Sequence, residues 1–221
     1  MTWSQREPGA LAGIYQICRE RLFAVPSTED LFNPYGDEDA DFDRSGAALE
    51  RGNNLKRYLA SYRDRPEVVV IAEAPGPWGC RFSGVPITSE EQLVDADFPL
   101  AGTVSGKGDL PHREYSARIF WRVMAPYFPG FIAWNAVPFH PHRVGEPMSI
   151  RTPRTSELKG FAWLTRAVLD VVEPGIVIAL GRKAQYQLDY LGVDCTYVRH
   201  PSQGGAVLFE EGMKRLFRAM R

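Results

Sequence analysis

The chain has 221 residues, 44% of them hydrophobic, and a formal net charge of −1 at pH 7. These totals suit one sizeable globular domain, and the near-neutral charge alone gives no indication of a nucleic-acid partner. The three cysteines, Cys18, Cys80 and Cys195, are far apart and form no C-x-x-C motif, which argues against a disulfide framework and a four-cysteine metal or iron–sulfur site. No apolar run is long enough to span a bilayer and residues 1–8 lack the apolar core of a signal peptide, so we expect a cytoplasmic protein.

Charge is distributed unevenly along the chain. The first 112 residues contain 11 Lys and Arg against 18 Asp and Glu, whereas the remaining residues contain 15 against 9. Two interpretations stay open: the second half carries a basic face, or the charges are simply scattered.

The N-terminal part begins with apolar residues at helical spacing, which predict a helix over 10–23. The stretch from Ser27 to about Arg44 is rich in turn formers and acidic residues, a composition that favours a solvated surface loop. The alternative is a long loop that folds over a binding crevice, with Tyr35 near its tip. A second helix is predicted over 47–62.

The rest of the chain alternates between predicted strands and helices. Short apolar runs predict strands buried on both faces. The strands span 67–72, 131–137, 176–181 and 196–199, and the helices span 116–125, 154–172, 182–190 and 207–220. This alternation implies an α/β fold with a parallel sheet and right-handed crossovers.

Polar residues follow three of these strands, beside turn formers: Glu73, Asn135 and His200. The carboxyl ends of parallel strands lie side by side, so these side chains can converge on one crevice. An amide can pair with the edge of a heterocyclic base, an imidazole can stabilise a leaving group, and a carboxylate can position or deprotonate water. Taken singly, each residue also fits a structural role, as a salt-bridge partner, a strand-end amide and a turn residue respectively.

Two further histidines, His140 and His142, follow the second of these strands. No acidic or thiol ligand stands beside them in the sequence. We therefore expect a loop with exposed imidazoles rather than a metal site.

The three polar residues stand in motifs that resemble those of the uracil-DNA glycosylase superfamily. Residues 73–79 (Glu-Ala-Pro-Gly-Pro-Trp-Gly) are similar to its first motif, Trp134-Asn135 to the segment that reads uracil, and 200–202 (His-Pro-Ser) to its final motif. The order and spacing also match over about 66–221. The resemblance implies a three-layer α/β sandwich with a central four-stranded parallel sheet flanked by helices. We expect a single such domain over 1–221, with N-terminal helices and the acidic loop in 1–65 and the core in 66–221.

The resemblance also implies roles for particular residues. Asn135 would hydrogen-bond an extruded uracil, His200 would stabilise the departing base, and Glu73 would place the attacking water. The uracil pocket would also contain Ala74, Gly76, Phe82 and Ile87. DNA would be contacted by Arg182, Lys183, Ser202, Gln203 and Gly204, with Arg199 nearby.

The motifs combine features of two branches of that superfamily. Glu-Ala-Pro-Gly is closer to the branch with an iron–sulfur cluster, whose cysteines are missing here, so we expect no cofactor and no metal. Residues 76–79 and 84–86 look more like the single-strand-selective monofunctional branch. Ala74 stands where several branches carry Asp or Asn as the water-binding group. Ile87 stands where a base-stacking aromatic is expected, so Phe82 or Trp78 is the alternative stacking partner, and 203–205 contain no bulky wedge residue.

The leading hypothesis is therefore a monofunctional uracil-DNA glycosylase that leaves an abasic site, with uracil-containing or abasic DNA as its partner, no membrane association and a monomeric state. The first alternative is a non-catalytic binder of damaged or abasic DNA on the same fold. The second is an enzyme of small-molecule nucleotides, which is disfavoured because no phosphate-binding Gly-rich loop opens a helix after the first strand.

Overall fold

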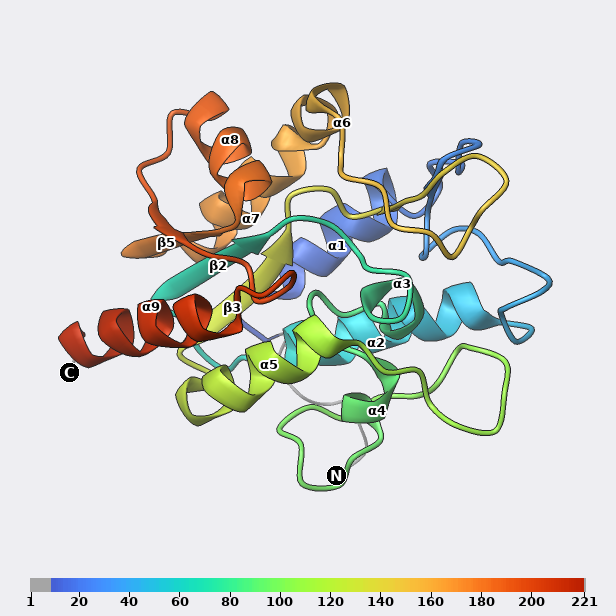
Figure 1. Ribbon diagram of the computed structural model, residues 1–221, viewed down its shortest axis with the longest axis horizontal. Coiled ribbons are helices and arrows are strands. Elements are labelled where there is room, and N and C mark those ends of the chain that lie inside the picture. The colour runs from blue at the N-terminus through green and yellow to red at the C-terminus, as the bar shows by residue number, and fades with distance from the viewer. Residues whose placement is uncertain (1–8, 221) are drawn as a thin grey trace.

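A computed structural model describes residues 9–220; Arg221 and residues 1–8, considered above for a signal segment, lie outside the described part. Four parallel strands form the central sheet in the order β3-β2-β5-β6 (Figure 1). They are β2 (Val68–Ala72), β3 (Phe131–Asn135), β5 (Ile176–Leu180) and β6 (Thr196–Val198). The predicted four-stranded parallel sheet is confirmed, with each strand slightly shorter than expected.

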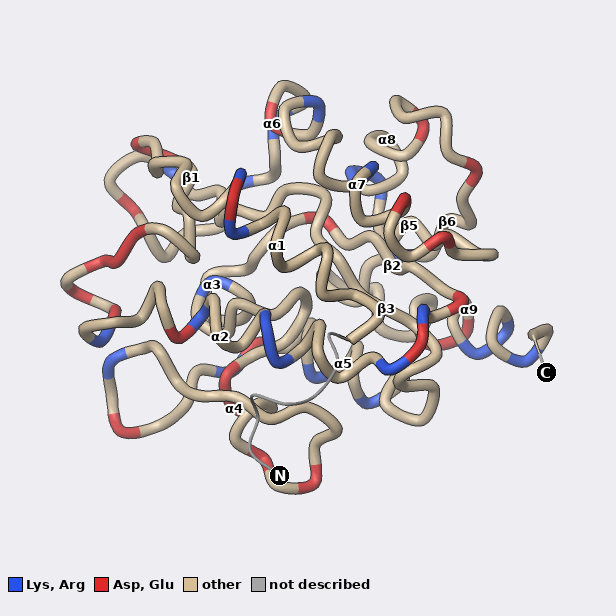
Figure 2. Tube along the Cα trace, turned by 180° about the vertical axis from the view of Figure 1, so that it is seen from behind, with Lys and Arg blue, Asp and Glu red and all other residues tan. Residues whose placement is uncertain are grey.

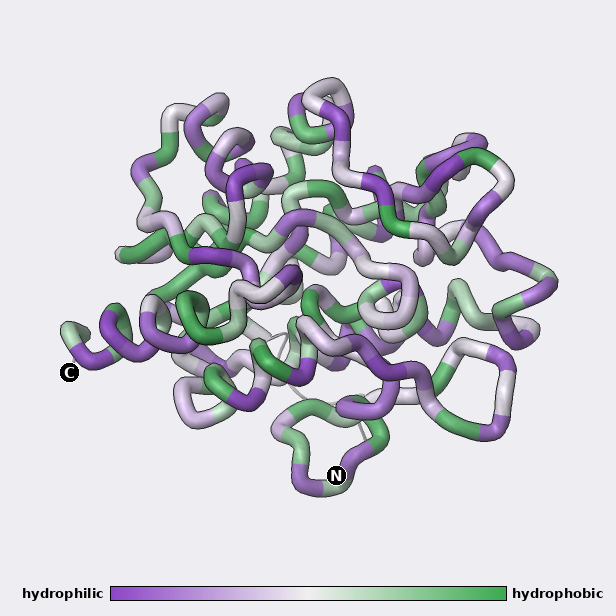
Figure 3. The backbone as a smooth tube through the Cα atoms, viewed as in Figure 1, coloured by the Kyte–Doolittle hydropathy of each residue, from purple (hydrophilic) through white to green (hydrophobic). Residues whose placement is uncertain are grey.

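The centre of the sheet is its most buried part. Every residue of β2 and β3 is buried, which explains why their sequences are uniformly apolar rather than alternating. Figure 3 shows these hydrophobic strands inside a more hydrophilic periphery. The register pairs Ala72 with Asn135, so the residues that follow β2 lie beside the last residue of β3.

Helices cover both faces of the sheet, as predicted. The long ones are α1 (Ala12–Arg21), α2 (Ala47–Ala60), α5 (Tyr115–Met124), α7 (Ala162–Val172), α8 (Arg182–Tyr190) and α9 (Ala206–Ala219). Helices α5 and α9 lie side by side over one face, whereas α1 packs with α2 and α7 on the other (Figure 1). No helix in the described part of the chain is both long and apolar enough to cross a membrane.

The single helix predicted over 154–172 is wrong, because the segment divides into α6 (Thr155–Gly160) and α7. Phe161 leaves the helical conformation at φ −98° and ψ 2°, directly after Gly160, a residue with poor helix propensity. The ring of Phe161 packs against Phe139 with centroids 5.0 Å apart. A tertiary contact therefore accompanies the break.

Several short elements were not predicted. They are β1 (Leu31–Phe32), α3 (Cys80–Ser83), α4 (Glu90–Leu93), the 3-10 helix η2 (Ala125–Tyr127) and β4 (His140–Pro141). Strands β1 and β4 pair antiparallel, with Leu31 opposite Pro141. This pair attaches the acidic segment (27–44) to the loop that follows β3.

The expectation of a solvated surface loop holds for only part of the acidic segment. Residues 36–42 are exposed or half-buried, whereas residues 33–35 are buried and Asp30 and Asp43 are at most 7% exposed. Tyr35 does not lie over a crevice, because its ring is buried and stacks on Phe23 with centroids 5.1 Å apart. The sequence was misleading here because acidic residues normally stay in water unless a partner compensates their charge.

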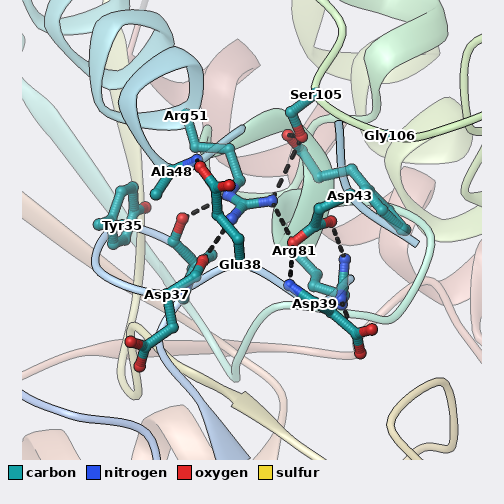
Figure 4. Close-up of polar contacts among 12 residues, drawn as sticks. Tyr35, Asp37, Glu38, Asp39, Asp43, Ala48, Arg51, Arg81, Ser105 and Gly106 are labelled. Carbon is teal, nitrogen blue, oxygen red and sulfur yellow. Dashed lines mark hydrogen bonds and ion pairs between the residues drawn. The ribbon is translucent and has the colours of Figure 1, made fainter. Parts of the chain in front are cut away.

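Two buried arginines supply that compensation. Asp43 accepts from Arg51 at 3.1 Å and from Arg81 at 2.8 Å, and Asp39 lies 3.6 Å from Arg81 (Figure 4). Arg51 also donates to the main-chain carbonyls of Pro34 and Asp37. This group of Asp39, Asp43, Arg51 and Arg81, here termed the buried ion-pair cluster, binds the acidic segment to α2 and α3.

Candidate active site

A cavity of about 410 Å³ opens at the carboxyl ends of the four parallel strands. Glu73 follows β2, Asn135 ends β3, Gly181 follows β5, and His200 lies two residues beyond β6; all four line this cavity. The strand ends meet at one edge of the sheet, where open α/β sheets place their ligands. The three polar residues that follow strands in the sequence are thus brought together.

The Glu73 carboxylate is half-buried and makes no hydrogen bond or ion pair with the described residues. Burial raises the pKa of this carboxyl above its ordinary value, and the nearby Lys183 ammonium partly opposes the rise. A carboxylate with a raised pKa and no protein partner is a stronger proton acceptor than an ordinary surface carboxylate. It is suited to a water molecule or a substrate hydroxyl in the cavity.

The His200 ring is held with one nitrogen toward the protein. Its Nδ1 atom accepts from the Ser202 amide at 3.2 Å and lies 2.8 Å from the Ser202 hydroxyl. Burial and the neighbouring Arg199 charge lower the pKa of His200 to about 4, so the imidazole is neutral at pH 7. Since the amide can only donate, Nδ1 carries no proton and the ring hydrogen lies on Nε2. His200 therefore offers a neutral N–H donor.

Asn135 is 4% exposed, and its amide nitrogen lies 3.5 Å from the Cys80 sulfur. Its Oδ1 atom has no hydrogen-bond partner among the described residues. One side of the amide is consequently engaged by the protein, while its carbonyl oxygen and second N–H remain available to a ligand.

Glu114 is a wall residue that sequence reasoning missed. It lines the cavity from the turn before α5, Ser116 donates a hydrogen bond to its Oε1, and its Oε2 has no partner. Burial raises the pKa of this carboxyl. A side chain at Gly76 or Gly79 would collide with the carboxyl group, so both glycines of the first motif make room for it. No local pattern around residue 114 indicates this contact.

The expectation of exposed imidazoles after β3 is wrong. His140 is 1% exposed and His142 is 8% exposed, and their rings stack with centroids 5.7 Å apart. His140 lines the cavity wall, with Nδ1 2.8 Å from the Pro75 carbonyl and Nε2 3.1 Å from the Pro147 carbonyl. Burial lowers the pKa of His140 to about 4. His140 thus connects the first motif to the loop after β4. Among residues 9–220, no group of three His, Cys, Asp or Glu side chains is arranged to hold a metal ion.

Cations stand around the cavity mouth. Arg151, Arg182, Lys183 and Arg199 all line it. Arg182 lies over the Tyr197 ring at 4.3 Å, and Arg182 and Lys183 form the first turn of α8, where the helix dipole adds positive potential. Figure 2 shows acidic segments of the N-terminal part at one end of the molecule and basic residues along α9 at the other. The cavity itself is lined by the four basic side chains named above, and the basic residues of α9 do not line it.

Most of the residues proposed for the site line this cavity. They are Glu73, Ala74, Gly76, Ile87, Asn135, Arg182, Lys183, His200, Ser202 and Gln203. The cavity lining does not include Gly204 or Phe82, whose fully buried ring packs against His112 at 3.9 Å. Ile87 is 7% exposed and adopts φ 48°, a strained conformation for a β-branched residue. The cavity wall additionally contains Cys80, Glu114, Ser116, His140, Arg151 and Thr152, none of which was assigned to the site from sequence.

The comparison with known proteins agrees with this class of fold and site. The family model of the uracil DNA glycosylase superfamily matches residues 59–215. The chain therefore belongs to this superfamily of DNA-repair glycosylases, which are hydrolases that act on DNA.

The crystal structure of wild-type SMUG2 from Pedobacter heparinus is similar to this chain in fold. The TM-score is 0.63 at 12% sequence identity, over 96% of this chain and 97% of that one. No curated protein sequence matches the chain.

Proposed function

We propose that this protein is a monofunctional uracil-DNA glycosylase that hydrolyses the N-glycosidic bond of deoxyuridine in DNA and leaves an abasic site. The observation that carries the proposal is the set of unpartnered polar atoms around one cavity. Glu73, Asn135 and His200 each present a group there that no described residue satisfies. The target base must leave the DNA stack to reach them.

Asn135 is proposed to recognise the base. Uracil has an N3–H donor beside an O4 acceptor, which matches a carbonyl oxygen and an N–H of one amide. Cytosine has an acceptor and a donor in the corresponding positions, so the same amide orientation opposes it. The aliphatic Ile87 side chain lines the same cavity and supplies apolar contact for the ring in place of an aromatic residue.

His200 and Glu73 are proposed to act on the bond itself. As the bond breaks, negative charge develops on the uracil ring, and a neutral Nε2–H donor stabilises it without requiring protonation of the imidazole. Glu73 accepts a proton from the water that attacks the anomeric carbon. Water is the nucleophile, so the products are free uracil and an abasic site, and no Schiff base with a lysine forms.

The cations of the cavity mouth are proposed to hold the DNA backbone. Lys183 makes no hydrogen bond or ion pair with the described residues, and it stands in the first turn of α8, where main-chain N–H groups are also available. A phosphate flanking the extruded nucleotide is the anion that this arrangement fits. Ser202 and Gln203 line the same cavity from the loop after β6, the strand beside β5, and are proposed to approach the same DNA strand.

The test uses oligonucleotides with a single uracil, single-stranded and paired with guanine or adenine. Purified protein is expected to release free uracil, and Glu73→Gln to release it at least ~100-fold more slowly. Borohydride is expected to trap no covalent complex. A wild-type protein that leaves every uracil substrate intact over a range of salt contradicts the proposal. If that inactive protein still retains abasic DNA in a binding assay, the non-catalytic binder is the correct description.

A further inference from the structure

An exposed isoleucine stands at the mouth of the cavity. Ile150 is 75% exposed and lines the cavity from residues 142–154, the segment that joins β4 to α6 and is here termed the β4–α6 loop. Residues 9–220 contain other exposed large apolar side chains, but Ile150 is the only one of them that also lines this cavity. Single exposed apolar residues are common on protein surfaces, so the position of Ile150 carries more information than its exposure.

Arg151 fixes the loop on one side of Ile150. The Arg151 amide donates to the Pro141 carbonyl at 3.2 Å, and its guanidinium makes two hydrogen bonds with the Glu157 carboxylate, at 2.7 and 3.0 Å. The guanidinium also donates to the main-chain carbonyl of Asp30 at 2.8 Å. These bonds attach the residue after Ile150 to β4, to α6 and to the acidic segment.

Ser149 fixes the loop on the other side. Its amide and its hydroxyl both donate to the Glu146 carbonyl, at 2.9 and 2.7 Å, and the hydroxyl accepts from the Arg143 amide at 2.8 Å. The Ile150 side chain is therefore presented to solvent by a main chain that is bonded on both sides. Little conformational freedom of the loop is lost when such a side chain enters a binding partner, which favours binding.

Extrusion of a nucleotide from duplex DNA leaves a gap in the base stack. Proteins that unstack DNA insert apolar side chains, Ile among them, between neighbouring bases. Residues 203–205 (Gln-Gly-Gly) offer no bulky apolar side chain, and Val207 and Leu208 are exposed on α9 but do not line the cavity. Ile150 supplies an apolar side chain at the cavity mouth, from the segment that follows β3 at the other end of the sheet order from β6.

We propose that Ile150 enters the base stack of duplex DNA and fills the gap left by the extruded deoxyuridine. The inference rests on the proposed function, because it requires that the cavity receives an extruded base. Burial of the side chain between bases removes its apolar surface from water, which offsets part of the cost of unstacking. That cost is smallest for a mismatched or single-stranded base. Ile150 should therefore matter for duplex DNA and not for a single strand.

The kinetic test compares uracil release from three substrates. Ile150→Ala is expected to lower kcat/KM by roughly 10-fold for uracil paired with adenine, by less for uracil opposite guanine, and to stay within ~2-fold of wild type for single-stranded DNA. Ile150→Leu keeps an apolar side chain of the same size and should restore most of the duplex activity. Val144→Ala is the matched control, since Val144 is 60% exposed in the same loop but does not line the cavity. It should leave all three rates unchanged.

A fluorescence measurement separates entry into the stack from the chemistry. The probe duplex carries 2′-fluoro-2′-deoxyuridine, whose glycosidic bond resists hydrolysis, beside 2-aminopurine, which becomes brighter when it is unstacked. Wild type and Val144→Ala are expected to raise the emission at saturation. Ile150→Ala is expected to raise it by about half as much or less, because the gap is no longer held open.

Equal losses on duplex and single-stranded substrates in Ile150→Ala overturn the inference, as do wild-type kinetics and emission in that variant. A duplex-selective loss in Leu208→Ala with none in Ile150→Ala also overturns it and transfers the role to α9. A wild-type protein that releases uracil from no substrate overturns the proposed function instead. In that case the emission of the probe duplex still decides whether Ile150 enters the stack.

Discussion

Two regions of the molecule keep charged side chains away from water, and they differ in how far those groups are satisfied. In the buried ion-pair cluster, each charge has an opposite charge of the protein within 3.6 Å, and Arg51 is also bonded to two main-chain carbonyls (Figure 4). Only Nε and Nη2 of Arg81 are buried there without a hydrogen-bond partner. In the strand-end cavity, Glu73 has no hydrogen-bond partner among the described residues, and Glu114 has one oxygen without a partner.

This difference separates stability from function. A buried charge whose partners are supplied by the protein is stable only while those partners remain, so such a cluster acts on folding. A polar atom that faces a cavity without a partner lowers the stability of the free protein and is available to a ligand. The predictions below test this separation, beginning with the largest expected effect.

Removing the polar groups of the cavity should abolish activity and leave the fold intact. Asn135→Ala and His200→Ala are each expected to reduce kcat/KM for uracil-containing DNA by roughly 100-fold or more, because they remove contacts to charge that develops during the reaction. Steady-state kinetics with thermal unfolding measured in parallel tests this. A loss of activity explained entirely by unfolding would remove the distinction between the two regions.

Breaking the buried ion-pair cluster should lower the stability of the fold and preserve the activity of the folded protein. Asp43→Ala removes the carboxylate bound to Arg51 and leaves Arg81 with only Asp39, 3.6 Å away, so it is expected to lower the free energy of unfolding by about 3–5 kcal/mol. The specific activity of the folded fraction should remain measurable at low temperature. The matched control is Arg65→Gln, since the Arg65–Glu173 pair is exposed and is worth at most ~1 kcal/mol. Denaturant unfolding compares the two variants, and equal losses would contradict the role assigned to burial.

The pH dependence of the rate should report the environment of Glu73. The base must be ionised to accept a proton from water, so kcat/KM is expected to rise with pH through the pKa of Glu73, ~10-fold per pH unit below it. Because burial raises this pKa, the acid limb should lie above the range of an ordinary Glu, about 4.3. His200, with a pKa lowered to about 4, should not limit the rate near neutrality. A limb at or below the ordinary Glu value would contradict the buried environment of Glu73.

The smallest expected effect concerns Glu114. The pKa of this carboxyl is raised in the folded protein, so folding favours its protonated form, and its contribution to stability is lost as pH rises through the folded pKa. Glu114→Gln keeps the shape and removes the ionisation, so it should be more stable than wild type by about 1 kcal/mol above that pH, with the difference vanishing in acid. Thermal melts from pH 4 to pH 8 measure the trend. A variant less stable than wild type across the range would indicate that Glu114 is ionised and satisfied.

Local patterns predicted the framework of the site well. The apolar runs of β2 and β3, followed by Glu73 and Asn135, indicated buried strands with polar ends, and the parallel sheet places those ends together. These features are readable because strand burial and strand termination depend on residues adjacent in the chain.

The second layer of the site depended on tertiary structure. Cys80, Glu114 and His140 reach the cavity only because helix α3, the turn before α5 and strand β4 pack behind the strand ends. Likewise, Asp43 of the acidic segment is buried because it meets Arg51 of α2 and Arg81 of α3. The sequence by itself determined which residues end the strands. Only the packing of distant segments decided which buried charges were compensated and which polar atoms remained free for a ligand, because the free energy of a buried polar group depends on the partners that surround it.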